Sequence, residues 1–135
     1  SAKAFADIHQ LIWEKFICNV MCSAPCAAFE CNIGELFADK DRRQVALGCL
    51  IEAHEIGIAK GIHFSFEDVL AYGTKFAELM PNANPSMRLD HLAGRKSEID
   101  AINGMVPMLG KELGIATPYN DTVVALVRSK EASFH

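Results

Sequence analysis

The stretch IHQLIWEKFICNV, residues 8–20, spaces its apolar side chains three and four residues apart. On a helical wheel of about 100° per residue these side chains gather on one side. That side consists of His9, Trp13, Phe16, Ile17 and Val20. The same spacing recurs along the chain, and no segment alternates apolar and polar residues over the length of a strand. The sequence therefore predicts an all-α fold.

Capping signals divide the rest of the chain into helices with short connections. An apolar residue follows Gly57 and Gly114, a pattern that predicts a left-handed helix stop. Ser65 with Asp68 resembles a capping box, and Pro118 suits a first helical position. We expect one domain, residues 1–135, of about six helices. They run from about Ala4 to Met21 (a kinked continuation past Pro25 is left open), Asp41 to Ile56, Ser65 to before Pro81, Pro85 to near Gly94, Ser97 to Leu113, and Thr117 through Val127.

The composition is that of a globular domain. Of 135 residues, 50% are hydrophobic and 22% are charged, with a formal net charge of −4. This balance excludes intrinsic disorder. No run approaches the ~20 apolar residues of a membrane span, and the first residues lack a signal peptide's apolar core, so we expect a cytoplasmic protein without a membrane partner. The mild acidity argues against a nucleic-acid partner.

Five cysteines lie in the first half of the chain: Cys18, Cys22, Cys26, Cys31 and Cys49. Their odd count agrees with a reducing compartment. A helix would align three of them, but a zinc site needs a second pair or histidines, so we expect buried thiols and no metal. The chain also lacks the G-x-G-x-x-G and G-x-x-x-x-G-K-[ST] patterns, and so carries no recognisable nucleotide-binding loop.

Two further sides of the first helix differ in polarity. We expect one side to face solvent, and it consists of Asp7, Gln10 and Glu14. The other side has the apolar character of a buried surface: Ile8, Leu11 and Ile12. Towards the C-terminal end this second side turns polar, with Lys15, Asn19 and Ser23. That polar patch is either a functional cleft or a lysine whose alkyl chain snorkels at the domain edge.

A second group of polar residues lies around Ser86 and Glu98. Ser86 directly follows Pro85 and is either a first-turn residue or a site residue. Ser97 with Asp100 forms a plausible capping box, and the helix dipole favours an acid such as Glu98 in the first turn. Spacing alone does not separate these structural roles from catalytic ones.

Three sequence blocks resemble the ketopantoate reductases (2-dehydropantoate 2-reductases). Residues 13–19, WEKFICN, resemble the family's W-x-K-x-x-x-N block. Residues 86–90, SMRLD, and 94–104, GRKSEIDAING, resemble its S-M-x-x-D and G-R-x-[ST]-E-I-D-x-I-N-G block. Residues 114–120, GIATPYN, are similar to its G-[IV]-x-[TV]-P-x-N ending. The three blocks occur in the family's order, and the resemblance runs from about Ile8 to Glu131, nearly the whole chain.

The resemblance implies a fold and a partner domain. Such enzymes pair an N-terminal Rossmann domain, which binds NADPH, with a helical C-terminal domain that closes over a 2-keto acid. The C-terminal domain belongs to the 6-phosphogluconate dehydrogenase-like type. This chain resembles the helical domain alone, without the Rossmann domain. The resemblance also allows a homodimer.

Residue roles follow by the same resemblance. Lys15 matches the catalytic lysine, which protonates the carbonyl oxygen. Asn19 and Ser86 match substrate-binding residues, and Glu98 matches a glutamate that contacts the cofactor. Ser23 stands in place of a second substrate-binding asparagine, and we expect it to bind the substrate there. Ile33 stands in place of a third such asparagine. These two departures leave another 2-keto acid open as the substrate.

Two functions of different classes remain. The first is the substrate-binding, proton-donating domain of an NADPH-dependent 2-dehydropantoate 2-reductase in pantothenate and coenzyme A biosynthesis, or of a related reductase for another 2-keto acid. The second is a non-catalytic helical dimerisation or interaction module. For the first we expect Lys15, Asn19, Ser86 and Glu98 to converge on one open concavity.

Overall fold

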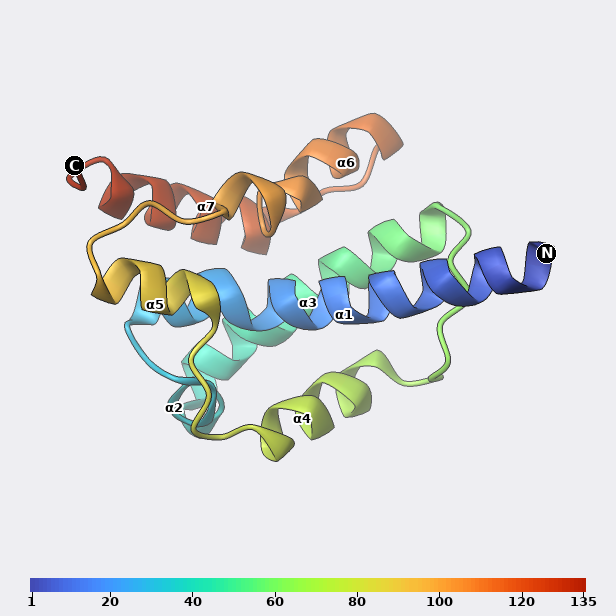
Figure 1. Ribbon diagram of the computed structural model, residues 1–135, viewed down its shortest axis with the longest axis horizontal. Coiled ribbons are helices and arrows are strands. Elements are labelled where there is room, and N and C mark those ends of the chain that lie inside the picture. The colour runs from blue at the N-terminus through green and yellow to red at the C-terminus, as the bar shows by residue number, and fades with distance from the viewer.

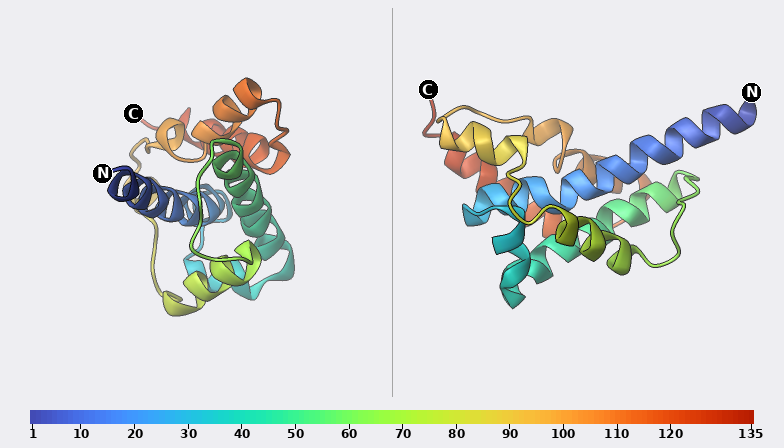
Figure 2. Two further views of the ribbon diagram at one scale, coloured as in Figure 1. Left: turned by 90° about the vertical axis from the view of Figure 1, so that its right-hand side faces the viewer. Right: turned by 60° about the horizontal axis from the view of Figure 1, so that its bottom comes forward.

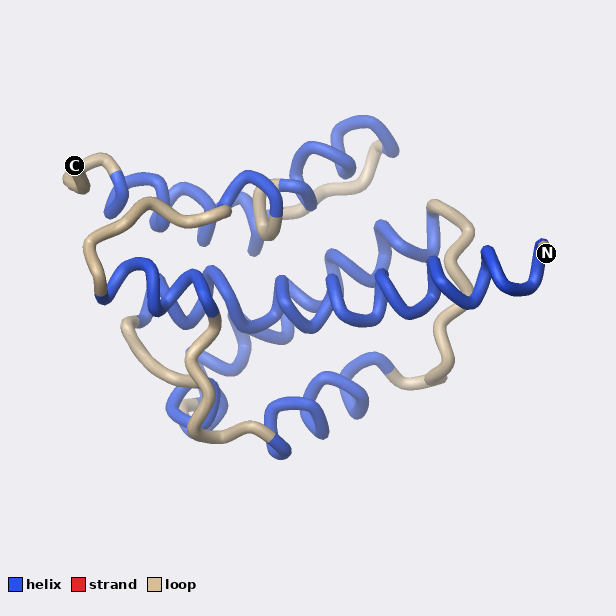
Figure 3. Tube along the Cα trace, in the orientation of Figure 1, coloured by secondary structure: helices blue, strands red, loops and turns tan.

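The computed structural model describes residues 1–135 and confirms the all-α prediction, because it contains helices and no strand (Figure 3). The elements in chain order are α1 (Ala2–Phe29), α2 (Ile33–Ala38), α3 (Lys40–Ala59), α4 (Val69–Leu79), α5 (Ser86–Leu92), the 3-10 helix η1 (Ile99–Ala101), α6 (Met105–Leu113) and α7 (Pro118–Glu131). None of these helices combines the length and the apolar character needed to cross a membrane.

The other helices are arranged around α1 (Figure 1). This helix packs most extensively against α3 and also contacts α2, α4, α5 and α7. In Figure 1, α4 lies below α1, and α6 and α7 lie above it. The N-terminal half of α1 projects beyond the rest of the bundle, as the right-hand view of Figure 2 shows.

The core surrounds the C-terminal half of α1. Ile17, Val20 and Met21 are completely buried, and they belong to one cluster with Leu50 of α3 and Val127 of α7. Between residues 17 and 27 only Asn19 is exposed, because neighbouring helices cover the other sides of α1. Each fully buried large aliphatic side chain stabilises the fold by about 1.5–3 kcal/mol relative to exposure.

Helix α1 extends beyond Met21 and continues past Pro25, which is the continuation that the sequence left open. It includes Pro25 and ends at Phe29, before Glu30 in the left-handed conformation with φ 56°. Proline removes only one backbone donor, and the burial of this segment outweighs that loss. The short helix α2 was not predicted, although its N-terminus carries a capping box between Asn32 and Glu35.

Helix α3 also continues past its predicted end, so the expected stop at Gly57 is wrong. A Cβ atom at Gly57 would lie 2.6 Å from the Phe64 ring and 3.3 Å from Trp13. Glycine is needed there for close packing inside the helix. The left-handed residue occurs later, at Gly61, where φ is 84°.

The predicted start of the third helix and the predicted helix 97–113 both need correction. Asp68, rather than Ser65, caps α4 by accepting a hydrogen bond from the Ala71 N–H. The segment 97–113 divides into η1 and α6, since both Ser97 donors bind Glu131 instead of forming a capping box. The stop at Gly114, with φ 71°, is confirmed. So is the start of α7 at Pro118.

The N-terminal half of α1 largely reverses the expected exposure of its two sides. Gln10 donates a hydrogen bond to the His63 carbonyl, and Glu14 accepts two from Ser65. The loop between α3 and α4 therefore half-buries Gln10 and Glu14, while Asp7 stays exposed as expected. The apolar side is exposed at Ile8 (57%), Leu11 (57%) and Ile12 (56%). Helical periodicity located these sides but did not show which of them a neighbouring segment covers.

Candidate functional site

A groove of about 360 Å³ opens beside α1, between α4 and the chain that leads into α5. Most of its lining is apolar. The lining residues are Lys15, Cys18, Asn19, Cys22, Ile33, Phe76, Met80, Ala83, Asn84 and Pro85. Such a groove, with a few polar groups among apolar walls, is typical of a small-molecule site.

Lys15 and Asn19 supply the polar side of this groove. They lie one turn apart on α1, so their side chains are neighbours. Both residues are exposed, and Lys15 forms no ion pair with any acid of the chain. An unpaired ammonium beside an apolar wall is available to an anionic or electron-rich ligand. Of the four residues expected to converge on one open concavity, Lys15 and Asn19 line this groove and Ser86 and Glu98 do not.

Ser23 lies behind Asn19 rather than in the groove. It is completely buried, and its hydroxyl donates a hydrogen bond to Asn19 Oδ1. The contact therefore fixes the Asn19 carboxamide with its oxygen turned towards the protein. The Asn19 Nδ2 hydrogens remain available as donors.

Ser86 and Glu98 do not line the groove. Ser86 is exposed at the start of α5 and directly follows Pro85, the last residue of the groove lining. Glu98 is exposed just before η1, and its carboxylate forms no ion pair. The structure thus brings Lys15 and Asn19 together, sets Ser86 at the edge and leaves Glu98 outside the groove.

Several lining residues escaped the sequence analysis. Phe76 lies in the last turn of α4 and Met80 directly follows that helix, whereas Asn84 comes from the loop between Pro81 and Pro85. No local pattern distinguishes them from core or loop residues. The sequence offers only a weak signal for Asn84: Pro81 and Pro85 lie four residues apart, and prolines restrict the backbone of a loop.

The thiols beside the groove are unreactive at neutral pH. Burial, with a smaller effect of the Glu14 carboxylate, raises the pKa of Cys18 to about 12. Burial likewise raises the pKa of Cys22 to about 12. Thiols with such pKa values are protonated at neutral pH and are poor nucleophiles. All five cysteines are buried and free, as the sequence analysis expected.

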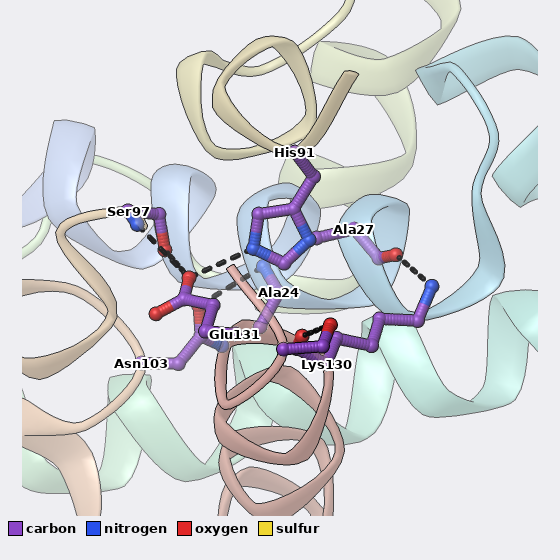
Figure 4. A network of polar contacts seen from close by, with 8 residues as sticks. Ala24, Ala27, His91, Ser97, Asn103, Lys130 and Glu131 are labelled. Atoms are coloured by element: carbon purple, nitrogen blue, oxygen red, sulfur yellow. Dashed lines mark hydrogen bonds and ion pairs between the residues drawn. The ribbon is translucent and has the colours of Figure 1, made fainter. Parts of the chain in front are cut away.

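A second polar cluster joins α5, α7 and the segment before η1 (Figure 4). Glu131 Oε2 accepts hydrogen bonds from the Ser97 N–H at 2.9 Å and the Ser97 hydroxyl at 2.5 Å. His91 Nε2 lies 2.8 Å from the same oxygen. Burial alone would raise the pKa of Glu131, but the bonds from Ser97 and His91 together outweigh it and lower that pKa. The cluster ties the segment before η1 to the end of α7.

This fold and groove define a class, the helical domains of dehydrogenases and reductases. A solved PanE/ApbA family ketopantoate reductase from Ralstonia eutropha JMP134 superposes with a TM-score of 0.83 and 31% identity, over 91% of this chain and 41% of that one. D-mandelate dehydrogenase in complex with NADH superposes with a TM-score of 0.82 and 30% identity, over 95% of this chain and 44% of that one.

The family profile described as ketopantoate reductase PanE/ApbA C terminal matches residues 7–131, and the chain belongs to this family. A 2-dehydropantoate 2-reductase from Streptococcus pyogenes is 36% identical over 122 residues, which are 90% of this chain and 40% of the relative. One from Archaeoglobus fulgidus is 29% identical over 131 residues, 97% of this chain and 44% of the relative. The chain thus spans less than half the length of these relatives.

Proposed function

We propose that this chain is the C-terminal, substrate-binding domain of an NADPH-dependent reductase that converts 2-dehydropantoate to pantoate in pantothenate and coenzyme A biosynthesis. The pair of Lys15 and Asn19 in one groove carries the proposal, because an ammonium and an amide can bind a 2-keto acid together. A Rossmann domain of the same protein completes the site. The five free thiols agree with work in the reducing cytoplasm.

Lys15 is the proton donor in this proposal. When bound, NADPH supplies the hydride, and the keto oxygen then needs a proton. The Lys15 ammonium stabilises the developing negative charge on that oxygen and delivers the proton from Nζ. The apolar lining of the groove strengthens this interaction, since it keeps the local dielectric constant low.

Asn19 and Ser86 bind the substrate. Ser23 occupies Asn19 Oδ1, so Asn19 offers its Nδ2 hydrogens to a carboxylate or hydroxyl oxygen. Ser23 thereby acts as a positioning residue rather than as the direct ligand expected from the sequence. Ser86 adds a hydroxyl at the edge of the groove.

The residues of this chain suit one end of the cofactor. The exposed Glu98 carboxylate can accept hydrogen bonds from amide or hydroxyl groups, whereas it repels phosphates. The chain also has no glycine-rich phosphate loop. We therefore infer that Glu98 contacts the nicotinamide carboxamide or a ribose hydroxyl of NADPH, and that the Rossmann domain binds the phosphates.

A reductase for another 2-keto acid is the second candidate. The groove walls contain Ile33, Phe76 and Met80, which suit an apolar substituent on the acid. D-mandelate dehydrogenase, whose ternary structure holds NADH and anilino(oxo)acetate, also shares the fold, with a TM-score of 0.82 and 28% identity. Comparing kcat/KM for ketopantoate with that for 2-keto acids bearing apolar or aromatic substituents separates the two candidates.

The decisive experiment is steady-state kinetics on the full-length protein and its Lys15→Ala variant. We expect turnover to fall by ~10²–10⁴, the usual contribution of a positioned general acid. Asn19→Ala should mainly raise the KM of the keto acid. The control, Lys111→Ala, removes an exposed lysine of α6 and should change neither constant. A Lys15→Ala variant with near-normal turnover would refute the catalytic assignment of Lys15. A full-length protein without reductase activity would favour a non-catalytic module.

A further inference from the structure

Two asparagines from separate sequence blocks meet in the core. Asn103 belongs to the block GRKSEIDAING and Asn120 to the block GIATPYN, and neither has a part in the proposed chemistry. Both residues are completely buried. Asn103 Nδ2 donates a hydrogen bond to Asn120 Oδ1 at 2.9 Å. Buried amides of this kind are costly unless every polar atom is satisfied, so their contacts identify what they hold.

The Asn103 carboxamide binds the backbone of α1. Its Nδ2 donates to the Val20 carbonyl at 2.9 Å, and its Oδ1 accepts from the Ala24 N–H at 3.2 Å. Figure 4 shows the side chain beside Ala24. These backbone groups are four residues apart and pair with each other in a regular α-helix. The next residue, Pro25, has no N–H, so Asn103 supports α1 where its own hydrogen bonding is weakest.

Asn120 anchors this contact to two other helices. Its Nδ2 donates to Glu52 Oε1 at 2.9 Å and lies 3.3 Å from the Cys49 carbonyl, both on α3. Glu52 in turn accepts the backbone N–H groups of Tyr119 and Asn120 at the start of α7, each at 2.9 Å. A continuous set of buried hydrogen bonds thus joins α1 to α3 and α7.

The supported turn is the one that carries the groove's amide. Asn19 directly precedes Val20, and Ser23, which orients Asn19, directly precedes Ala24. We propose that Asn103 is a positioning residue for the reaction: by holding the Val20 carbonyl and the Ala24 N–H, it sets the direction of Asn19 and, one turn earlier, of Lys15. This inference rests on the proposed function.

The test uses the full-length protein with Asn103→Asp and Asn103→Ser. Both variants lose the amide donors, and a displacement of about 1 Å in a site can cost about 100-fold. We expect kcat/KM for the keto acid to fall about 10- to 100-fold, while the Kd of NADPH changes less than about threefold because its phosphates bind outside this groove. The control is Val127→Ala, which leaves a cavity in the same core. It should lower stability but keep wild-type kinetics.

The pH profile separates positioning from a merely structural role. Burial raises the pKa of a carboxyl group, and a protonated Asp at position 103 regains one donor. The deficit of Asn103→Asp should therefore shrink as pH falls, whereas that of Asn103→Ser should stay constant relative to the wild type. If neither variant folds, Asn120→Ser, which loosens only the anchor, should lose about three- to tenfold in kcat/KM.

The outcomes distinguish this inference from the proposed function. Wild-type kinetics in any folded variant of Asn103, or a deficit no larger than that of Val127→Ala, would show that Asn103 only stabilises the fold. If Asn120→Ser is the only variant that folds, wild-type kinetics in that variant would also overturn the proposal. An inactive wild type would instead overturn the proposed function, and a Lys15→Ala variant with near-normal turnover would overturn the catalytic role of Lys15.

Discussion

Glu131 illustrates how one buried carboxylate depends on its donors. Glu131 is 6% exposed. Its Oε2 atom accepts hydrogen bonds from the Ser97 N–H and the Ser97 hydroxyl, and it also faces His91. Because its pKa lies below the ordinary value in the folded protein, the ionised form is favoured by folding. The resulting stabilisation is present above the unfolded pKa and is lost as pH falls through the lower, folded pKa.

We predict that Ser97→Ala destabilises the protein by about 1–3 kcal/mol at pH 7, because a bond to a charged group is removed. In this variant the pKa of Glu131 in the folded protein should rise. The difference in unfolding free energy between variant and wild type should therefore shrink once the pH falls below about 4. Urea unfolding followed by circular dichroism between pH 3 and 8 measures this. Ser133→Ala, at an exposed serine, is the control. A pH-independent difference would contradict the role of Glu131.

At the scale of the element, α7 receives its N-terminal cap from another helix. Thr117 precedes the helix but provides no side-chain cap bond. The Glu52 carboxylate of α3 accepts the N–H groups of Tyr119 and Asn120 instead, each at 2.9 Å. A carboxylate at this end also interacts favourably with the helix dipole. The start of α7 is therefore coupled to α3.

Glu52→Gln should cost about 1–3 kcal/mol of unfolding free energy. The charge is lost, and an NH2 group replaces one of the two oxygens, so that a donor faces other donors. Glu55→Gln, an exposed change one turn away on α3, should cost less than about 0.5 kcal/mol. Chemical denaturation of both variants compares them directly. Equal stabilities would mean that the Glu52 cap contributes nothing.

At the scale of the whole molecule, the half of α1 that projects beyond the bundle (Figure 2) carries an exposed apolar surface. Four large side chains form it: Phe5 (65% exposed), Ile8 (57%), Leu11 (57%) and Ile12 (56%). Lys15 and Asn19 continue the same side of the helix into the groove. Exposed apolar patches usually mark interaction sites, and the Rossmann domain of the proposed reductase is the occupant we propose.

The isolated chain should consequently self-associate at high concentration. The double change Ile8→Lys with Leu11→Lys should shift it towards monomer, because charges replace the centre of the patch. Leu126→Lys, an exposed leucine on α7, should have no such effect. Sedimentation velocity over a concentration series measures the shift, and a wild-type chain that stays monomeric throughout would refute the prediction.

Local sequence patterns determined much of this protein. Periodicity specified the helices, Gly114 and Pro118 marked an end and a start, and the four-residue spacing of Lys15 and Asn19 made them neighbours. These features depend only on residues within a turn or two of each other. Neighbouring residues on one helix keep their relation whatever the rest of the chain does.

Only the tertiary structure decided which sides are covered and which polar groups meet. The contacts of Asn103 with Val20 and Ala24 span 83 and 79 residues of sequence. No local pattern reveals such a partner. In sequence, an asparagine that holds the backbone of another helix, such as Asn103, therefore looks like an asparagine in an exposed loop. The same applies to the apolar side of α1 at Ile8, because periodicity reports where apolar residues lie, while burial requires another surface to pack against them.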